Sequence, residues 1–247
     1  MESGERMTSV VTAVVCVVLM NIAAATLILL RSRVYGVRLY RPMLLNVVLS
    51  FLPVLLAIVG VSGLMLLVPA IQLAGASAPV LLWTYVALAT LVWLLFFPNS
   101  VYLITELNLS HREDGPTPVP LWYDIVQTLT LTISGIANAV LSLAILQTVL
   151  IVLFIDPARP TVPASSWVFA VVVIVLGAVG VYLGRYLRFN SWDVRHPLGM
   201  LRKLGAHFRV RGKALEAFAF VVTHALLITL IYVPVYALAA ASLFSAR

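Results

Sequence analysis

The sequence predicts an all-α fold, a polytopic transmembrane helical bundle with about six transmembrane helices and both termini outside. Three observations predict it: the composition, the length of the charge-free stretches and the placement of the basic residues. Of the 247 residues, 62% are hydrophobic and 10% are charged, whereas a soluble domain carries about 25% charged residues. This composition excludes an ordinary soluble domain, and its hydrophobicity excludes a disordered chain.

The spans follow from five stretches that lack Asp, Glu, Lys, Arg and His. A bilayer core requires about 20 apolar residues of helix. Four of the stretches fit one helix each, and the fifth, 42–105, fits two with a break near Gly75 and Pro79. The predicted spans are 9–30, 43–67, 80–97, 123–153, 166–184 and 214–243.

Local signals support each span in turn. The first span follows Glu2 and Glu5, which are unlike the positively charged start of a cleavable signal peptide, and it ends before Arg31. Charged residues or prolines mark a border of each later span, namely Arg41, Pro79, Asp124, Arg185 and Lys213.

The basic residues indicate the orientation. Four of the 16 lie in 31–42, one in 98–122 and eight in 185–213, which are loops on one side of a six-helix arrangement. Cytoplasmic loops are enriched in Lys and Arg. These three loops are therefore predicted to face the cytoplasm, which leaves both termini on the outside.

The remaining composition limits the class of function. No soluble domain separates from the spans, so residues 1–247 are predicted to form a single integral membrane domain. The basic loops account for the net charge of +7, and no nucleic-acid-binding module is present in the sequence. The single cysteine, Cys16, excludes a disulfide framework. No helical His/Glu pair with metal-ligand spacing, P-loop or dinucleotide fingerprint occurs, so no metal and no cofactor are expected.

The first candidate motif, 97–107, follows the third span. Pro98 disfavours helix at the residue before it, and Asn99 is a good cap for a new short helix. On that helix Asn99, Tyr102 and Glu106 share one face. The favoured interpretation is an interfacial helix with its polar side in water. The alternative is a broken helix whose polar face lines a cavity.

The second candidate motif is the run Gly-Arg-x-x-Arg-x-Asn-Ser-Trp-Asp, which leaves the fifth span on the same side. Arg185 and Arg188 are three residues apart and can point one way from a helix end. Two guanidinium groups there can clamp a phosphate or a carboxylate. Asn190 can cap a following helical segment, and Asp193 can pair with either arginine. The alternative is a basic anchor beside an aromatic belt that includes Trp192.

A third acidic position opens the fourth span. Asp124 lies where the helix dipole favours a carboxylate, and a first-turn charge is its simplest interpretation. The topology brings Glu106, Asp124 and Asp193 to the same membrane face as the two arginines. These five groups either neutralise one another or form a site.

Polar residues also lie inside the spans. Asn46 and Asn138 are expected to make interhelical hydrogen bonds, and His224 is expected to be a packing histidine. No acidic residue lies deep in any span, which argues against an ion-driven transporter.

The two motifs resemble those of a family of bacterial multi-pass membrane proteins of unknown function. The family's runs are Pro-Asn-x-x-Tyr-x-x-Thr-Asp/Glu-Leu and Gly-Arg-x-x-Arg-x-Asn-Ser-Trp-Asp, and the Trp-Tyr-Asp element at 122–124 also fits. The resemblance extends from about Arg41 to the sixth span, with Glu106 where Asp is expected. It implies a multi-pass protein of the bacterial plasma membrane, and it implies no activity.

Three functions remain open, and whether the protein is an enzyme stays undecided. The first is a cytoplasmic polar site that binds or processes an anionic lipid headgroup or small anion. Its ligand-binding candidates are Asn99, Tyr102, Arg185, Arg188, Asn190 and Trp192, and its candidate bases are Glu106, Asp124 and Asp193. The second is a structural or assembly protein, partnered by other membrane proteins, whose polar motifs form a static network. The third is a small-solute transporter.

Overall fold

The computed structural model describes residues 2–107, 118–154, 162–188 and 197–244, and within these ranges the chain is all-α. Its elements are α1 (Glu2–Tyr35), α2 (Arg41–Leu73), η1 (Gly75–Ser77), α3 (Ala78–Tyr102), η2 (Leu103–Leu107), α4 (Leu121–Phe154), α5 (Ala164–Leu187), α6 (Pro197–Phe208) and α7 (Lys213–Phe244), where η denotes a 3-10 helix. Every α-helix except α6 is long and apolar enough to cross a membrane. The prediction of six spans is confirmed, and the chain is a multi-pass membrane protein.

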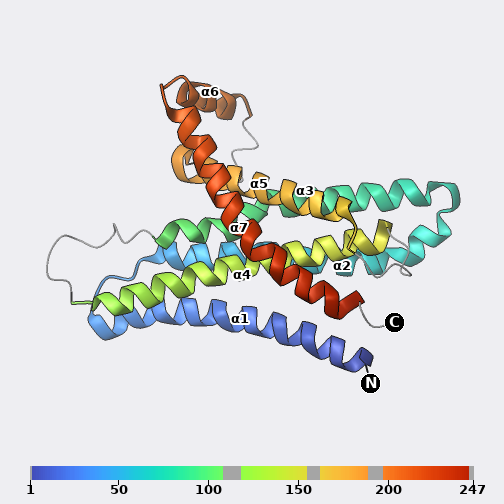
Figure 1. Cartoon of the computed structure of the whole chain (residues 1–247), viewed down its shortest axis with the longest axis horizontal. Coiled ribbons are helices and arrows are strands. Elements are labelled where there is room, and N and C mark those ends of the chain that lie inside the picture. Colours follow the sequence, from blue (N-terminus) through green and yellow to red (C-terminus); the bar gives the residue numbers. More distant parts are fainter. Residues whose placement is uncertain (1, 108–117, 155–161, 189–196, 245–247) are drawn as a thin grey trace.

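The helices form one elongated bundle. Figure 1 shows α1 to α5 lying roughly lengthwise beside one another, with α7 crossing them at an angle and α6 set apart beyond its start. Both termini lie at one end, as an even number of spans requires (Figure 1). The opposite end is called the basic end below, and it comprises residues 31–41, 103–107, 118–124, 185–188 and 197–213.

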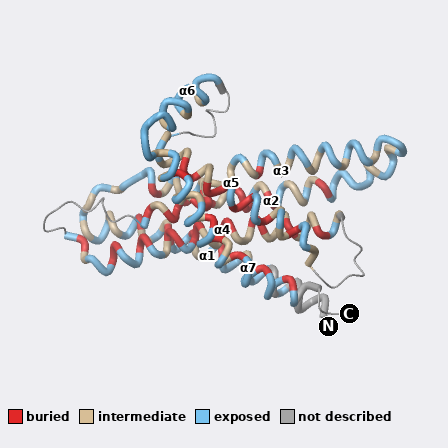
Figure 2. The backbone as a smooth tube through the Cα atoms, turned by 45° about the horizontal axis from the view of Figure 1, so that its top comes forward, coloured by how far each residue is buried: buried red, intermediate tan, exposed pale blue. Residues whose placement is uncertain are grey.

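Helix α4 is at the centre of the bundle, because it contacts α1, α2, α3, α5 and α7. Buried residues gather where the helices face one another, and the outward surfaces are exposed (Figure 2). Those outward surfaces carry large apolar side chains such as Leu66, Leu88 and Val168. An apolar exterior of this kind is in contact with the lipid bilayer.

A buried hydrogen-bond network joins four helices near the middle of the bundle. Asn21 of α1 and Asn138 of α4 donate to each other's side-chain oxygens at 2.8 and 3.0 Å. Asn138 also donates to the Ser50 hydroxyl of α2 at 3.0 Å, and the Ser100 hydroxyl of α3 donates to the Ser50 carbonyl at 2.5 Å. The expected interhelical hydrogen bond of Asn138 is confirmed. Such bonds satisfy polar groups that lipid cannot satisfy.

The predicted helix break at Pro98 is wrong. Helix α3 continues through Pro98 to Tyr102, so Asn99 is an interior helical residue and caps no new helix. A Cβ added to Gly180 of α5 would overlap the Pro98 ring, and one added to Gly177 would lie 2.7 Å from Phe97. The ring therefore occupies space left by a glycine on the neighbouring helix. Proline is tolerated inside transmembrane helices because neighbouring groups compensate for the lost backbone bond.

The interpretation of 97–107 as an interfacial helix with its polar side in water is also wrong for Glu106, which is buried. Glu106 is 5% exposed, whereas the neighbouring Leu107 is 45% exposed. The chain tightens into the 3-10 helix η2 after Tyr102. A 3-10 helix has three residues per turn, so it changes which residues share a face.

Candidate functional site

The candidate site lies at the basic end, where η2, the start of α4 and the end of α5 meet α1 and α2. Two carboxylates from different elements are buried there, Glu106 of η2 and Asp124 of α4. A buried charge is costly unless it is paired and hydrogen-bonded. The partners of each carboxylate therefore indicate what the site is built to do.

Asp124 pairs with a residue that the sequence analysis did not select. The Nε atom of Arg31, in the last turns of α1, donates to Asp124 Oδ1 at 2.9 Å. The neighbouring Tyr123 donates its hydroxyl to the Leu27 carbonyl at 2.8 Å, and its ring meets the edge of Tyr35. These contacts fix the start of α4 to the end of α1. Arg31 was counted among the basic residues that indicate the orientation. Nothing else in the sequence around it indicates that it pairs with a buried carboxylate.

Glu106 has a different environment. Asn46 of α2 donates to Glu106 Oε1 at 3.3 Å, which confirms the interhelical hydrogen bond expected of Asn46. The Arg185 guanidinium of α5 lies in the neighbourhood of the Tyr102 phenol and of the Glu106 carboxylate. Four elements, α2, α3, η2 and α5, thus contribute an amide, a phenol, a carboxylate and a guanidinium to one cluster. We call Asn46, Tyr102, Glu106 and Arg185 the Glu106 cluster.

A buried amide lies deeper in the bundle, one turn along α4 from Asp124. The Gln127 side chain is buried, and its Nε2 atom donates only to the weak acceptor Met43 Sδ, at 3.4 Å. Among the described residues, its Oε1 atom has no hydrogen-bond partner. Met43 and Asn46 lie one turn apart on α2, so Gln127 lies between the Asp124 pair and the Glu106 cluster. Gln127 was not among the predicted site residues, although a glutamine near the end of an apolar span indicates a possible site.

The two arginines of the second motif differ in backbone conformation. Arg185 is in the last turn of α5, but Arg188 is the residue that ends the helix. Arg188 adopts a left-handed conformation with φ 53° and ψ 40°, and its backbone N–H bonds to the Leu183 carbonyl. Left-handed backbone is unfavourable for a residue with a Cβ and is usually taken by glycine at this position.

The other candidate residues are placed as follows. Asn99 is half-buried in α3, one turn before the half-buried Tyr102. Asn190, Trp192 and Asp193 lie outside the residues that the structure describes. No group of three or more His, Cys, Asp or Glu side chains suited to a metal ion occurs in the described part of the chain.

His224, expected to be a packing histidine, lies away from this site in α7. Its Nδ1 atom is 2.8 Å from the Phe220 carbonyl, and its ring stacks on that of Phe220 at 3.7 Å. Both contacts are made within α7 itself.

Comparison with known proteins gives one match. The model of a family described as a protein of unknown function, DUF1361, matches residues 45–231. Neither a curated protein nor a solved structure matches the chain. The matched segment contains the whole Glu106 cluster and Asp124 but not Arg31. The chain is a multi-pass membrane protein that belongs to the DUF1361 family, whose function is unknown.

Proposed function

We propose that the basic end faces the cytoplasm of a bacterial cell and binds an anionic group there, with Arg185 and Arg188 as its cationic ligands. The anion is the headgroup of an anionic lipid or a small free anion, since both offer the same oxygen chemistry to guanidinium groups. The observation that carries the proposal is Arg188, an exposed arginine held in left-handed backbone at the end of α5. Backbone strain of this kind is concentrated at functional sites.

The distribution of charge supports this proposal. The ion pairs that join two described residues are Arg31–Asp124 and Lys213–Glu216. Asp124 is thus already matched by Arg31, and Glu106 is engaged by Asn46 and lies near Arg185. Neither described carboxylate of the site uses the charge of Arg188. The net charge of the side chains at this membrane face is positive, which favours the binding of an anion.

Within the proposed site, the Glu106 cluster sets the position of Arg185. Tyr102 and Glu106 lie near the guanidinium, and Asn46 donates a hydrogen bond to the carboxylate. Asn99, Asn190 and Trp192 complete the proposed ligand set, and Asp193 is proposed as a partner of an arginine. If the bound group is also processed, Glu106 is the better candidate base, because Asp124 is paired with Arg31.

The proposal is tested by thermal unfolding of the purified protein in dodecyl maltoside. The added probes are inorganic phosphate, short-chain phosphatidylglycerol and, as a neutral control, short-chain phosphatidylcholine. Stabilisation by phosphate and phosphatidylglycerol identifies a general oxyanion site, and stabilisation by phosphatidylglycerol alone identifies a lipid headgroup.

The variant Arg185→Ala/Arg188→Ala is expected to lose this stabilisation by the anionic probes. The control Arg209→Ala/Arg211→Ala removes the same charge from exposed residues after α6 and is expected to retain it. Equal loss in both variants, or no stabilisation of the wild type, would overturn the proposal.

A structural role is the second candidate, favoured by the part-buried Arg31–Asp124 pair. In this role the polar residues serve only to hold the helices together. The charge-swapped pair Glu106→Arg/Arg188→Glu is then tolerated, and other membrane proteins copurify. A small-solute transporter is not favoured by a broken helix here, because α3 is continuous through Pro98.

A further inference from the structure

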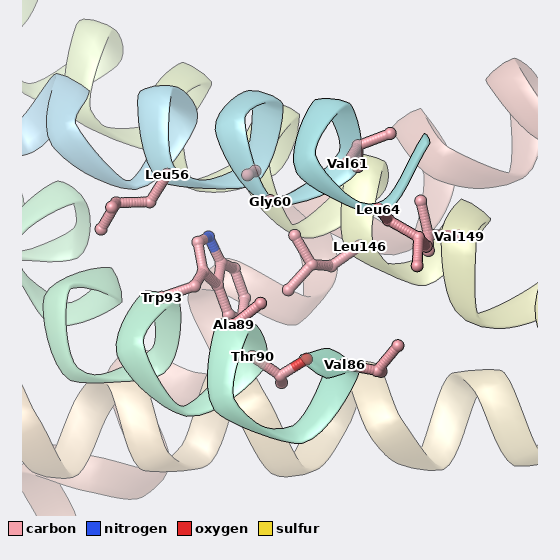
Figure 3. A pocket seen from close by; sticks show the side chains of 11 residues that line it. Leu56, Gly60, Val61, Leu64, Val86, Ala89, Thr90, Trp93, Leu146 and Val149 are labelled. Carbon is pink, nitrogen blue, oxygen red and sulfur yellow. The ribbon is translucent and has the colours of Figure 1, made fainter. Parts of the chain in front are cut away.

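The cavity between α2, α3 and α4 is too small for an organic ligand. Its volume is about 40 Å³, and its lining side chains are mostly apolar, such as Leu56, Val61 and Leu64 (Figure 3). Pockets that hold an organic ligand measure about 300 Å³ or more, whereas this cavity has room for about one water molecule. A larger partner has to be bound by an exposed surface instead.

Helix α6 carries an exposed surface of this kind. Leu201, Leu204 and Phe208 lie at positions i, i+3 and i+7, so they share one face of the helix. Leu201 and Phe208 are 58% and 39% exposed, and Leu198, one turn before Leu201, is 82% exposed (Figure 2). Ala206 lies on the opposite face and is also exposed. Helix α6 is thus amphipathic, and the described part of the chain covers its apolar face only in part.

The contacts of α6 place it at the border of the membrane. It contacts α5 and α7, which are both candidate spans. The Tyr182 hydroxyl of α5 and His207 Nε2 of α6 share a hydrogen bond of 2.8 Å. Tyr182 lies about 8 Å before the end of α5, at the helical rise of about 1.5 Å per residue. A helix held at this depth has acyl chains on one side and water on the other.

The charges around α6 match an anionic surface. The stretch 197–213 contains the basic residues Arg202, Lys203, Arg209, Arg211 and Lys213 and no acidic residue. Arg202 is exposed and lies one turn after Leu198, at the edge of the apolar face. The stem of an arginine lies along apolar surface while its guanidinium stays in the polar layer. Basic residues at this position are attracted by anionic lipids.

We propose that α6 binds the bilayer surface at the basic end, in a leaflet that contains anionic lipids. Its face with Leu198, Leu201 and Phe208 lies against the outer part of the acyl chains, and Arg202 contacts the headgroup phosphates. The Tyr182–His207 hydrogen bond sets the depth of the helix. This surface shares no residue with the proposed anion site, and it rests on other observations.

Spin labels on the two faces of α6 test this proposal. Cys16 is the single cysteine of the chain, so the variants Leu201→Cys and Ala206→Cys in a Cys16→Ser background each carry one label. Both positions are exposed, so a label there needs no repacking of the bundle. The labelled proteins are placed in nanodiscs of phosphatidylcholine with and without phosphatidylglycerol. Power-saturation EPR measures how accessible each label is to oxygen and to a water-soluble nickel complex.

The label at Leu201→Cys is expected to be accessible to oxygen and protected from nickel, and the label at Ala206→Cys is expected to show the reverse. Adding Arg202→Gln to Leu201→Cys is expected to lower the ratio of immersed to water-exposed label about fivefold with phosphatidylglycerol, and to leave it unchanged in phosphatidylcholine alone. Equal accessibilities at the two positions would overturn the immersion of α6. An equal effect of Arg202→Gln in both bilayers would overturn the contact with anionic headgroups. Neither readout involves Arg185 or Arg188, so a failure of this surface is distinguishable from a failure of the anion site.

Discussion

Arg31 and Asp124, 93 positions apart in the chain, meet at 2.9 Å and connect the end of α1 to the start of α4. The two side chains differ in exposure, at 29% for Arg31 and 9% for Asp124. The pair therefore lies at the border between the buried bundle and its surroundings. Its geometry and its burial lead to the first prediction.

Arg31→Ala is expected to destabilise the protein more than Asp124→Ala does. The first variant takes a cationic partner from a buried carboxylate, whereas the second leaves an arginine that can turn to water. We expect a loss of about 1–3 kcal/mol for Arg31→Ala, below the range for a fully buried pair because Arg31 is partly exposed. Chemical unfolding of both single variants and the double variant measures the coupling. Additive effects of the two substitutions would show that the ion pair contributes no coupling energy.

Gly180→Ala is expected to destabilise the bundle by about 1–3 kcal/mol, because the new methyl group overlaps the rigid Pro98 ring. Gly199→Ala in the exposed helix α6 is the matched control, since its Cβ would meet nothing within 4 Å. The control is expected to be neutral or slightly stabilising, as alanine favours helix. Thermal unfolding of both variants tests the packing. A neutral Gly180→Ala would refute the close approach of α3 and α5.

Asn138→Ala is expected to cost about 1–3 kcal/mol, because it leaves Asn21 without its reciprocal partner in the bundle interior. The double variant Asn21→Leu/Asn138→Leu is expected to lose less than the sum of its single variants, since it removes both polar groups together. Thermal unfolding in detergent measures Asn138→Ala, the two single leucine variants and the double variant. Strict additivity would contradict the hydrogen-bonded pair.

Arg188→Gly is expected to keep or raise stability, by up to about 1 kcal/mol, because glycine adopts the left-handed backbone without strain. The same variant is expected to weaken anion binding. Thermal unfolding of this variant measures its stability, and phosphate titration of the same sample measures its anion binding. Together they distinguish an arginine that binds the anion from one that only stabilises the fold. A loss of stability would mean that the Arg188 side chain holds the fold together.

The six spans were predictable because long charge-free runs have no other stable structure in this composition. The buried role of Asn138 was predictable for a similar reason, since an amide in hydrocarbon needs a partner. The continuity of α3 through Pro98 was not predictable, because it depends on Gly180, a residue 82 positions later on another helix.

The candidate site was predicted only in part. Glu106, Tyr102 and Arg185 were selected and do come together. Arg31 was missed because its charge fitted the orientation signal. The left-handed backbone of Arg188 has no sequence signal, since arginine rarely adopts it.

The most direct test of anion binding at the basic end is native mass spectrometry of gently purified protein. The wild type is compared with Arg185→Ala/Arg188→Ala and with Arg209→Ala/Arg211→Ala. Anion binding by Arg185 and Arg188 predicts that the wild type and Arg209→Ala/Arg211→Ala retain an anionic species. The same species is expected to be absent from Arg185→Ala/Arg188→Ala. Identical retained species in all three proteins would contradict it and leave the polar residues of the basic end with a structural role.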